Sequence, residues 1–79
     1  MITDDFYKKR MRQYNMDEEA FRIVYSFLED KAKEAKSQGD KKKEQAYLEV
    51  QILFLNRNIK LRKEKNQLKA QYEHQKKRA

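Results

Sequence analysis

The sequence predicts an all-helical fold: an antiparallel helical hairpin with a long C-terminal helix and a short N-terminal helix, assembled as a dimeric coiled coil or bundle. Proline is absent and glycine occurs once, at Gly39, so almost nothing interrupts a helix. Apolar residues recur at spacings of three and four, and no segment shows the alternation with period two that a half-buried strand requires. A chain of 79 residues allows a single domain, which we expect to cover residues 1–79.

The first predicted helix is short and covers residues 3–14. Thr3 is a good N-cap, and two aspartates follow it in the first turn, where the helix dipole favours negative charge. The apolar positions of this segment step by four and three and therefore share one face of the helix: Tyr7, Met11 and Tyr14.

The second predicted helix covers residues 15–37. Asn15 is an N-cap candidate, and Glu18, three residues later, completes an approximate capping box. Asn inside a helix costs only about 0.7 kcal/mol relative to Ala, so two alternatives remain for the first helix: it continues into the second, or it folds back. The apolar stripe of the second helix consists of Phe21, Val24 or Tyr25, Leu28, Ala32 and Ala35.

The segment 37–40 predicts the turn between the second and third helices. Gly39 suits the left-handed position after a helix, and Asp40 is a natural N-cap for the next one. Nothing interrupts the residues that follow, so a long helix with a basic tail is predicted over 41–78. Its polar end, residues 71–79, is expected to fray.

A connection this short makes the helices on either side of it antiparallel neighbours. Pairing about the turn brings together residues whose numbers add to about 78. The expected contacts are Val24 with Phe54, Ile23 with Leu55, and Leu28 with Val50.

The long helix has more apolar surface than one neighbouring helix can cover. One stripe recurs every seven residues at Tyr47, Phe54, Leu61 and Leu68, and a helix with apolar residues on two faces requires two neighbours. The second neighbour is either the first helix folded back or another copy of the chain, and we expect another copy, giving a homodimer. Ile23 and Phe27 lie away from the main stripe of their own helix. The predicted partner or dimer interface consists of Ile23, Phe27, Leu48, Ile52, Leu55 and Ile59.

Residues for catalysis are scarce, and the sequence predicts that the protein is not an enzyme. There is no cysteine, and the one histidine, His74, lies in a charged segment where solvation explains it best. The acidic residues cluster at helix starts, where capping explains them, and one glycine cannot form a phosphate-binding loop. We therefore expect no catalytic residue, no metal or other cofactor and no small-molecule substrate.

Positive charge is concentrated near the C-terminus. Residues 60–79 carry eight Lys or Arg against two Glu, which raises the odds of an anionic partner. A solvated helix face explains this pattern as well as nucleic-acid binding does. Lys8, Lys9, Arg10 and Arg12 form a second cluster that joins the first only if the first helix continues into the second. The candidate nucleic-acid contacts are Arg62, Lys65, Lys69 and Lys76.

The sequence carries no predicted export signal, and its longest apolar run has four residues, 52–55. A cytoplasmic location and no membrane partner are therefore expected. The leading hypothesis is a non-catalytic interaction protein, a regulator, inhibitor or assembly factor, that binds a protein partner through an apolar helix face. The alternative is a nucleic-acid-binding regulator that uses its basic C-terminal helix.

Overall fold

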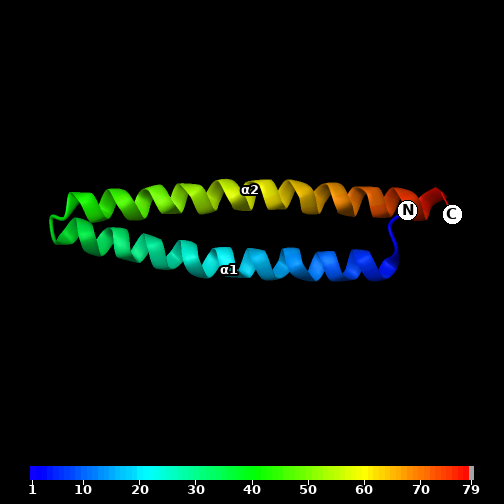
Figure 1. Cartoon of the computed structure of the whole chain (residues 1–79), viewed down its shortest axis with the longest axis horizontal. Coiled ribbons are helices and arrows are strands. Elements are labelled where there is room, and N and C mark those ends of the chain that lie inside the picture. The colour runs from blue at the N-terminus through cyan, green and yellow to red at the C-terminus, as the bar shows by residue number, and fades with distance from the viewer. Residues whose placement is uncertain (79) are drawn as a thin grey trace.

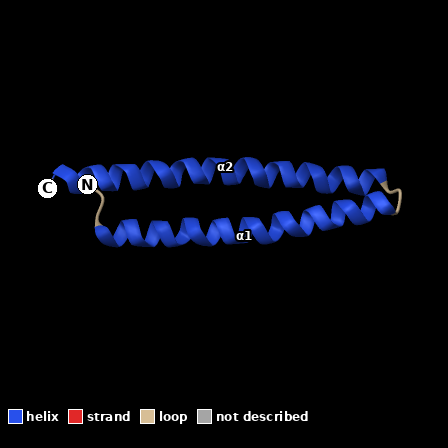
Figure 2. Cartoon of the chain, turned by 180° about the vertical axis from the view of Figure 1, so that it is seen from behind, coloured by secondary structure: helices blue, strands red, loops and turns tan. Residues whose placement is uncertain are grey.

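The computed structural model describes residues 1–78 and consists of two long helices, α1 (Asp4–Ser37) and α2 (Lys41–Arg78). The helices lie side by side and run in opposite directions, joined by one tight turn (Figure 1). Residues 1–78 contain no strand, and the few loop residues lie before α1 and between the helices (Figure 2). The hairpin is 61 Å long and 15 by 13 Å across. The prediction of an all-helical hairpin is confirmed.

The start of α1 follows from its local sequence. The Oγ1 atom of Thr3 accepts a hydrogen bond from the backbone N–H of Phe6 at 3.2 Å, which satisfies one of the free donors of the first turn. Asp4 and Asp5 occupy that turn, where they interact favourably with the helix dipole. The predicted N-cap is confirmed.

The predicted boundary at Asn15, between a helix over 3–14 and another over 15–37, is wrong, because α1 passes through it without interruption. The Asn15 side chain does not cap a helix. Its Oδ1 atom accepts a hydrogen bond from the Nζ atom of Lys65 on α2, at 2.9 Å. The cost of Asn in a helix is small, and a break here would separate Tyr14, which is buried, from its contacts with α2. The first helix therefore continues into the second.

The turn has the hydrogen bonds of a Schellman motif. The backbone N–H of Asp40 bonds the carbonyl of Ala35 at 2.9 Å, and that of Gly39 bonds the carbonyl of Lys36 at 3.1 Å. Gly39 has a φ of 73°, a conformation that glycine adopts without penalty. Asp40 Oδ1 then accepts from the backbone N–H of Lys43, so the predicted glycine and N-cap roles are confirmed.

The line of contact between the helices, here called the seam, has a heptad pattern. On α1 its central positions recur every seven residues. On α2 they alternate at spacings of three and four. The register is visible where the rings of Tyr7 and Tyr72 stack, with centroids 3.8 Å apart, so facing residues have numbers that add to about 79. The seam consists of Tyr7, Tyr14, Phe21, Leu28 and Ala35 on α1, and Glu44, Tyr47, Gln51, Phe54, Asn58, Leu61, Lys65, Leu68 and Tyr72 on α2.

This register differs by one residue from the expected one, which changes two of the three expected contacts. Leu28 is buried, but the side chain near it is Gln51, which bonds the carbonyl of Tyr25, whereas Val50 is exposed. Ile23 and Leu55 both point away from the seam and are exposed, so the expected contact between them is wrong. Val24 and Phe54 line one groove between the helices, as expected.

The core along the seam is thin because, from residue 44 to residue 65, α2 brings a polar residue to every second seam position: Glu44, Gln51, Asn58 and Lys65. Only five apolar side chains are buried among the described residues: Tyr14, Leu28, Ala32, Ala35 and Tyr72. In a chain of this size a small core rarely supplies more than about 3–5 kcal/mol of stability. The hairpin therefore gains little stability from its own seam.

Candidate interaction surfaces

A stripe of exposed apolar side chains follows α2 beside the seam. Each member comes one residue after a seam position, and one residue turns an α-helix by about 100°, so the stripe faces sideways rather than toward α1. Ile52 is the most exposed of the four, at 57%. The members of this α2 stripe are Leu48, Ile52, Leu55 and Ile59.

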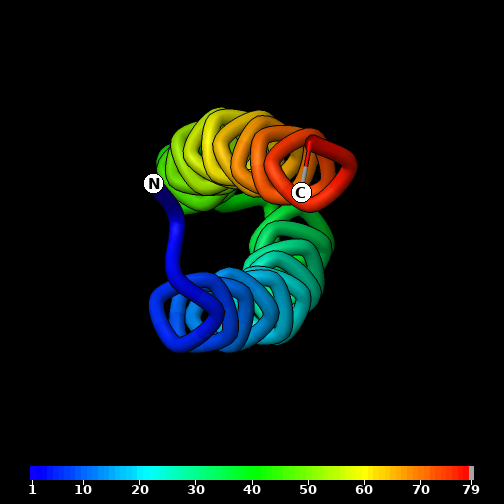
Figure 3. The backbone as a smooth tube through the Cα atoms, turned by 90° about the vertical axis from the view of Figure 1, so that its right-hand side faces the viewer, coloured from blue at the N-terminus to red at the C-terminus, as the bar shows by residue number. Residues whose placement is uncertain are grey.

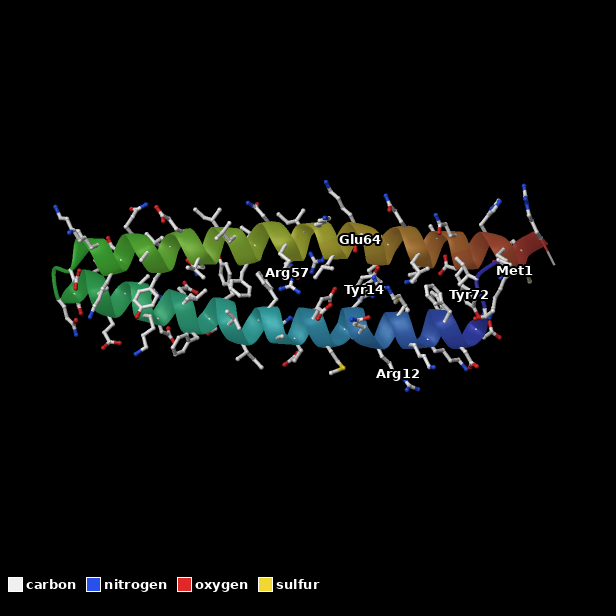
Figure 4. All side chains as sticks on the ribbon, in the orientation of Figure 1. Met1, Arg12, Tyr14, Arg57, Glu64 and Tyr72 are labelled. Carbon is white, nitrogen blue, oxygen red and sulfur yellow. The ribbon has the colours of Figure 1, made fainter. Side chains whose placement is uncertain are left out.

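The other side of the hairpin carries a second apolar surface. In antiparallel helices, the residues that precede a seam position lie on the same side of both helices. Phe27 and Ala20 on α1 precede Leu28 and Phe21, and Val50 and Leu53 on α2 precede Gln51 and Phe54, so these residues share one side. A groove runs between the helices here, lined by Ala20, Val24, Phe54, Arg57 and Leu61, and we call it the opposite groove. Figure 4 shows the Arg57 side chain directed between the helices.

The structure thus does not place the predicted interface residues on one surface. The four from α2 form the α2 stripe, whereas Phe27 belongs to the side of the opposite groove. Ile23, which is 64% exposed, comes two residues after Phe21 and points outward from α1. Once every seam position is known, the number of residues between a side chain and the nearest seam position tells on which side of the hairpin that side chain lies.

Charge is segregated along the length of the hairpin. The open end, residues 1–14 and 62–78, carries eleven Lys or Arg and four Asp or Glu, a net charge of +7. The turn half, residues 15–61, carries nine of each and is neutral. Most of the exposed large apolar residues, from Met16 to Ile59, lie in the turn half. The apolar and basic surfaces therefore occupy different stretches of the same rod.

Three of the four predicted nucleic-acid contacts lie on one line. Arg62, Lys69 and Lys76 follow each other at intervals of seven residues and are exposed, whereas Lys65 is a seam residue. The Nζ atom of Lys65 lies 3.3 Å from Glu18 Oε1 and 2.9 Å from Asn15 Oδ1, in a partly buried position. Lys65 is thus engaged within the hairpin. The continuity of α1 brings the cluster Lys8, Lys9, Arg10 and Arg12 to the same end as this basic line.

The open end is held closed by a group of contacts that the sequence did not reveal. Tyr72 stacks on Tyr7, and its hydroxyl donates a hydrogen bond to Asp4. Ile2 exchanges two hydrogen bonds with the side-chain amide of Gln75, at 2.8 and 2.7 Å. The first three residues cross from α1 to α2 at this end (Figure 3), and Figure 4 shows Tyr72 and Tyr14 between the helices, with Arg12 pointing away.

These contacts correct the expectation that residues 71–79 fray. The helix continues to Arg78, and Tyr72 is buried; Ala79 lies outside the described residues. Lys76 places its Nζ atom 4.7 Å from the centre of the Tyr72 ring. Hydrogen bonding to the Tyr72 side chain raises the pKa of Lys76 above its ordinary value.

Two other kinds of feature, a metal site and a membrane-spanning helix, are not found in residues 1–78. No group of three or more His, Cys, Asp or Glu side chains within this part of the chain is arranged to hold a metal ion. Neither helix has a stretch long and apolar enough to cross a membrane. Comparison of the chain with models of protein families, with curated proteins and with solved structures found no match.

Proposed function

We propose that the protein is a non-catalytic helical interaction protein, a regulator, inhibitor or assembly factor, that associates with itself and binds a protein partner through apolar helix faces. The observation that supports this proposal is the exposure of large apolar side chains on two sides of one slender hairpin. Contiguous exposed apolar surface rimmed by polar residues is typical of protein–protein interaction sites. The apolar turn half has no net charge, so it imposes no long-range repulsion on an approaching protein.

The two apolar surfaces suit two neighbours. The α2 stripe is confined to one helix, with aliphatic residues at the alternating spacings of a coiled-coil seam. The other surface combines the opposite groove with Phe27 from α1, and Ile23, one helical turn before Phe27, lies at its outer edge, so this surface offers a wider and more aromatic site. Aromatic residues are enriched at the energetic centres of interfaces, so we assign the partner protein to the surface with Phe27.

Replacing Ile23 and Phe27 together with Asp is expected to abolish binding of the partner. Both side chains are more than half exposed, so the hairpin should fold normally. Loss of residues at the centre of an interface costs about 2 kcal/mol or more, which weakens binding at least about 30-fold. The partner is first identified by affinity purification from the native cell and mass spectrometry, and its dissociation constant for each variant is then measured by calorimetry.

The matched control is the double variant Arg62→Glu with Lys69→Glu, which alters two exposed residues of the basic line. It should bind the partner as tightly as the parent. Partner binding that survives in the Ile23→Asp, Phe27→Asp variant, while helicity is unchanged, would contradict the assignment of this surface.

The second candidate function is nucleic-acid binding by the open end. It is favoured by one observation, the concentration of the entire +7 charge in residues 1–14 and 62–78, on both helices. The exposed basic line of Arg62, Lys69 and Lys76 would contact phosphates, and Lys65 would keep its place in the seam. Such binding is largely electrostatic and releases counterions.

A mobility-shift titration with duplex DNA and single-stranded RNA, at about 50 and 200 mM salt, tests this candidate. If the open end binds phosphates, affinity should fall steeply between the two conditions. The Arg62→Glu, Lys69→Glu variant should then lose about 0.9 in the salt slope for each lost contact. Absence of binding at the lower salt concentration would eliminate the nucleic-acid candidate and leave the protein-binding proposal intact.

A further inference from the structure

The α2 stripe is complementary to itself when a second copy runs in the opposite direction. Its midpoint lies between Ile52 and Leu55, so an antiparallel copy brings together residues whose numbers add to 107. Each layer then pairs one leucine with one isoleucine, Leu48 with Ile59 and Ile52 with Leu55. All four layers of the two-fold arrangement therefore contain one leucine and one isoleucine, which have similar volumes, and this allows close packing along the whole contact.

The register of the hairpin extends this alignment to α1. Residues facing each other across the seam add to about 79, so the midpoint of the α2 stripe lies level with the bond between Tyr25 and Ser26. Residues of two antiparallel α1 helices would then pair where their numbers add to 51. Arg22 thereby faces Glu29 of the second copy, and the same ion pair occurs twice.

Arg22 and Glu29 also lie on the correct side of α1. Arg22 comes one residue after the seam position Phe21, and Glu29 comes one residue after Leu28. The members of the α2 stripe have the same relation to the seam positions of α2. Residues just before the seam share one side of the hairpin, so residues just after it share the other. Glu29 accordingly lines the groove that contains Tyr25 and Leu48. Because the alignment was set by α2 alone, the opposite charges on α1 are independent support for it.

The distribution of net charge selects the antiparallel orientation. In a parallel pair the two open ends, each carrying a net charge of +7, would lie side by side. In the antiparallel pair the neutral halves overlap, and the Cα atoms of Lys69 in the two copies are about 46 Å apart along the axis, several Debye lengths at physiological ionic strength.

We propose that the face with the α2 stripe binds a second copy of the chain, in an antiparallel four-helix bundle whose two-fold axis passes between Ile52 and Leu55. This inference rests on the self-association in the proposed function and specifies its geometry. The second copy covers the α2 stripe and fills the groove beside Tyr25, Leu48 and Gln51. Overlap of the two turn halves involves two helices from each copy, as in four-helix bundles, and a stable complex should bury more than roughly 1,000 Å² there.

Cysteine crosslinking tests the orientation and register, because the natural chain has no cysteine. Gln45 and Arg62 are exposed, lie one layer beyond the two ends of the α2 stripe, and have numbers that add to 107. An equimolar mixture of Gln45→Cys and Arg62→Cys chains should form a disulfide-linked dimer on mild oxidation, whereas neither variant alone should do so. Within each variant the two thiols would be about 26 Å apart along the axis.

Crosslinking of Gln45→Cys with itself would indicate a parallel pair and overturn the inference. The inference would also be overturned if the mixture of Gln45→Cys and Arg62→Cys chains failed to crosslink although the parent sediments as a dimer. A parent chain that sediments as a strict monomer at high micromolar concentration would also overturn it. In that case the α2 stripe would bind a different protein. Binding of the partner through Ile23 and Phe27 would still be tested separately by the Ile23→Asp, Phe27→Asp variant.

A charge exchange provides a second test that does not depend on crosslinking. Arg22→Glu and Glu29→Arg should each raise the dissociation constant of the dimer about tenfold, because each creates two like-charge pairs across the two-fold axis. The combined variant restores two opposite-charge pairs and should return the dissociation constant to within about threefold of the parent. Additive weakening in the combined variant would overturn the inference, since residues that do not meet cannot rescue each other.

Discussion

Replacing Leu28 with Asp is expected to unfold the hairpin. Leu28 is 7% exposed and lies at a central seam position of α1. Removal of a buried leucine side chain typically costs about 2–5 kcal/mol, and a carboxylate without a partner at this position adds a desolvation cost. A seam this thin supplies no more than about 3–5 kcal/mol in total, so the single substitution removes all of it. Far-UV circular dichroism at a fixed protein concentration should show loss of helix at room temperature.

The control for this variant is Leu53→Asp, the same chemical change on the other helix. Leu53 is 67% exposed and lies beside the seam rather than in it, so the variant should retain its helicity and melt close to the parent. Equal melting temperatures for Leu28→Asp and the parent would show that the seam is placed wrongly.

Replacing Tyr72 with Ala is expected to release the open end. Tyr72 is buried, stacks on Tyr7 and bonds Asp4, so its truncation removes three kinds of contact at once. The expected loss is about 3 kcal/mol, which is concentrated at the open end because the turn half keeps its own seam residues. Hydrogen exchange should show the amides of residues 5–12 and 66–76 losing protection, whereas those near Gly39 keep theirs.

Tyr72→Phe separates stacking from hydrogen bonding at the same position. The ring remains on Tyr7, whereas the hydrogen bonds of the hydroxyl with Asp4 and Lys76 are lost, which should cost about 1 kcal/mol. Uniform loss of protection along both helices in Tyr72→Ala would mean that the hairpin opens as a single unit, contrary to the localised effect expected here.

The parts of the fold predicted from the sequence are those whose causes are local. Thr3, Gly39 and Asp40 act within a few residues of themselves, so their roles as caps and turn residue were readable without a structure. The antiparallel pairing also followed from a short turn, to within one residue. That one residue matters on a helix, because it rotates a side chain by about 100° and decides whether it lies in the seam or beside it.

The parts that sequence reasoning missed depend on partners far away in the chain. Asn15 remains inside a helix because it meets Lys65, fifty residues later, and that same contact removes Lys65 from the predicted basic surface. The end of α2 is ordered by Tyr7 and Ile2, at the other end of the sequence. No local pattern distinguishes such residues from solvated ones, because their environment is supplied by the other helix.

The length of the hairpin has a consequence for how its two ends communicate. At physiological ionic strength, electrostatic interactions in solution decay over about 8 Å, and the molecule is 61 Å long with its charge at one end. Phosphates bound at Lys69 and Lys76, as in the second proposed function, would lie about 26 to 36 Å along the axis from a protein bound around Phe27, so the charge of one ligand would be largely screened from the other. Because α1 and α2 are each continuous from end to end in the described residues, the spacing of two such ligands would also be fixed. If both proposed binding sites are occupied, the fold would act as a rigid spacer that holds two chemically unlike partners at a constant distance without coupling their affinities.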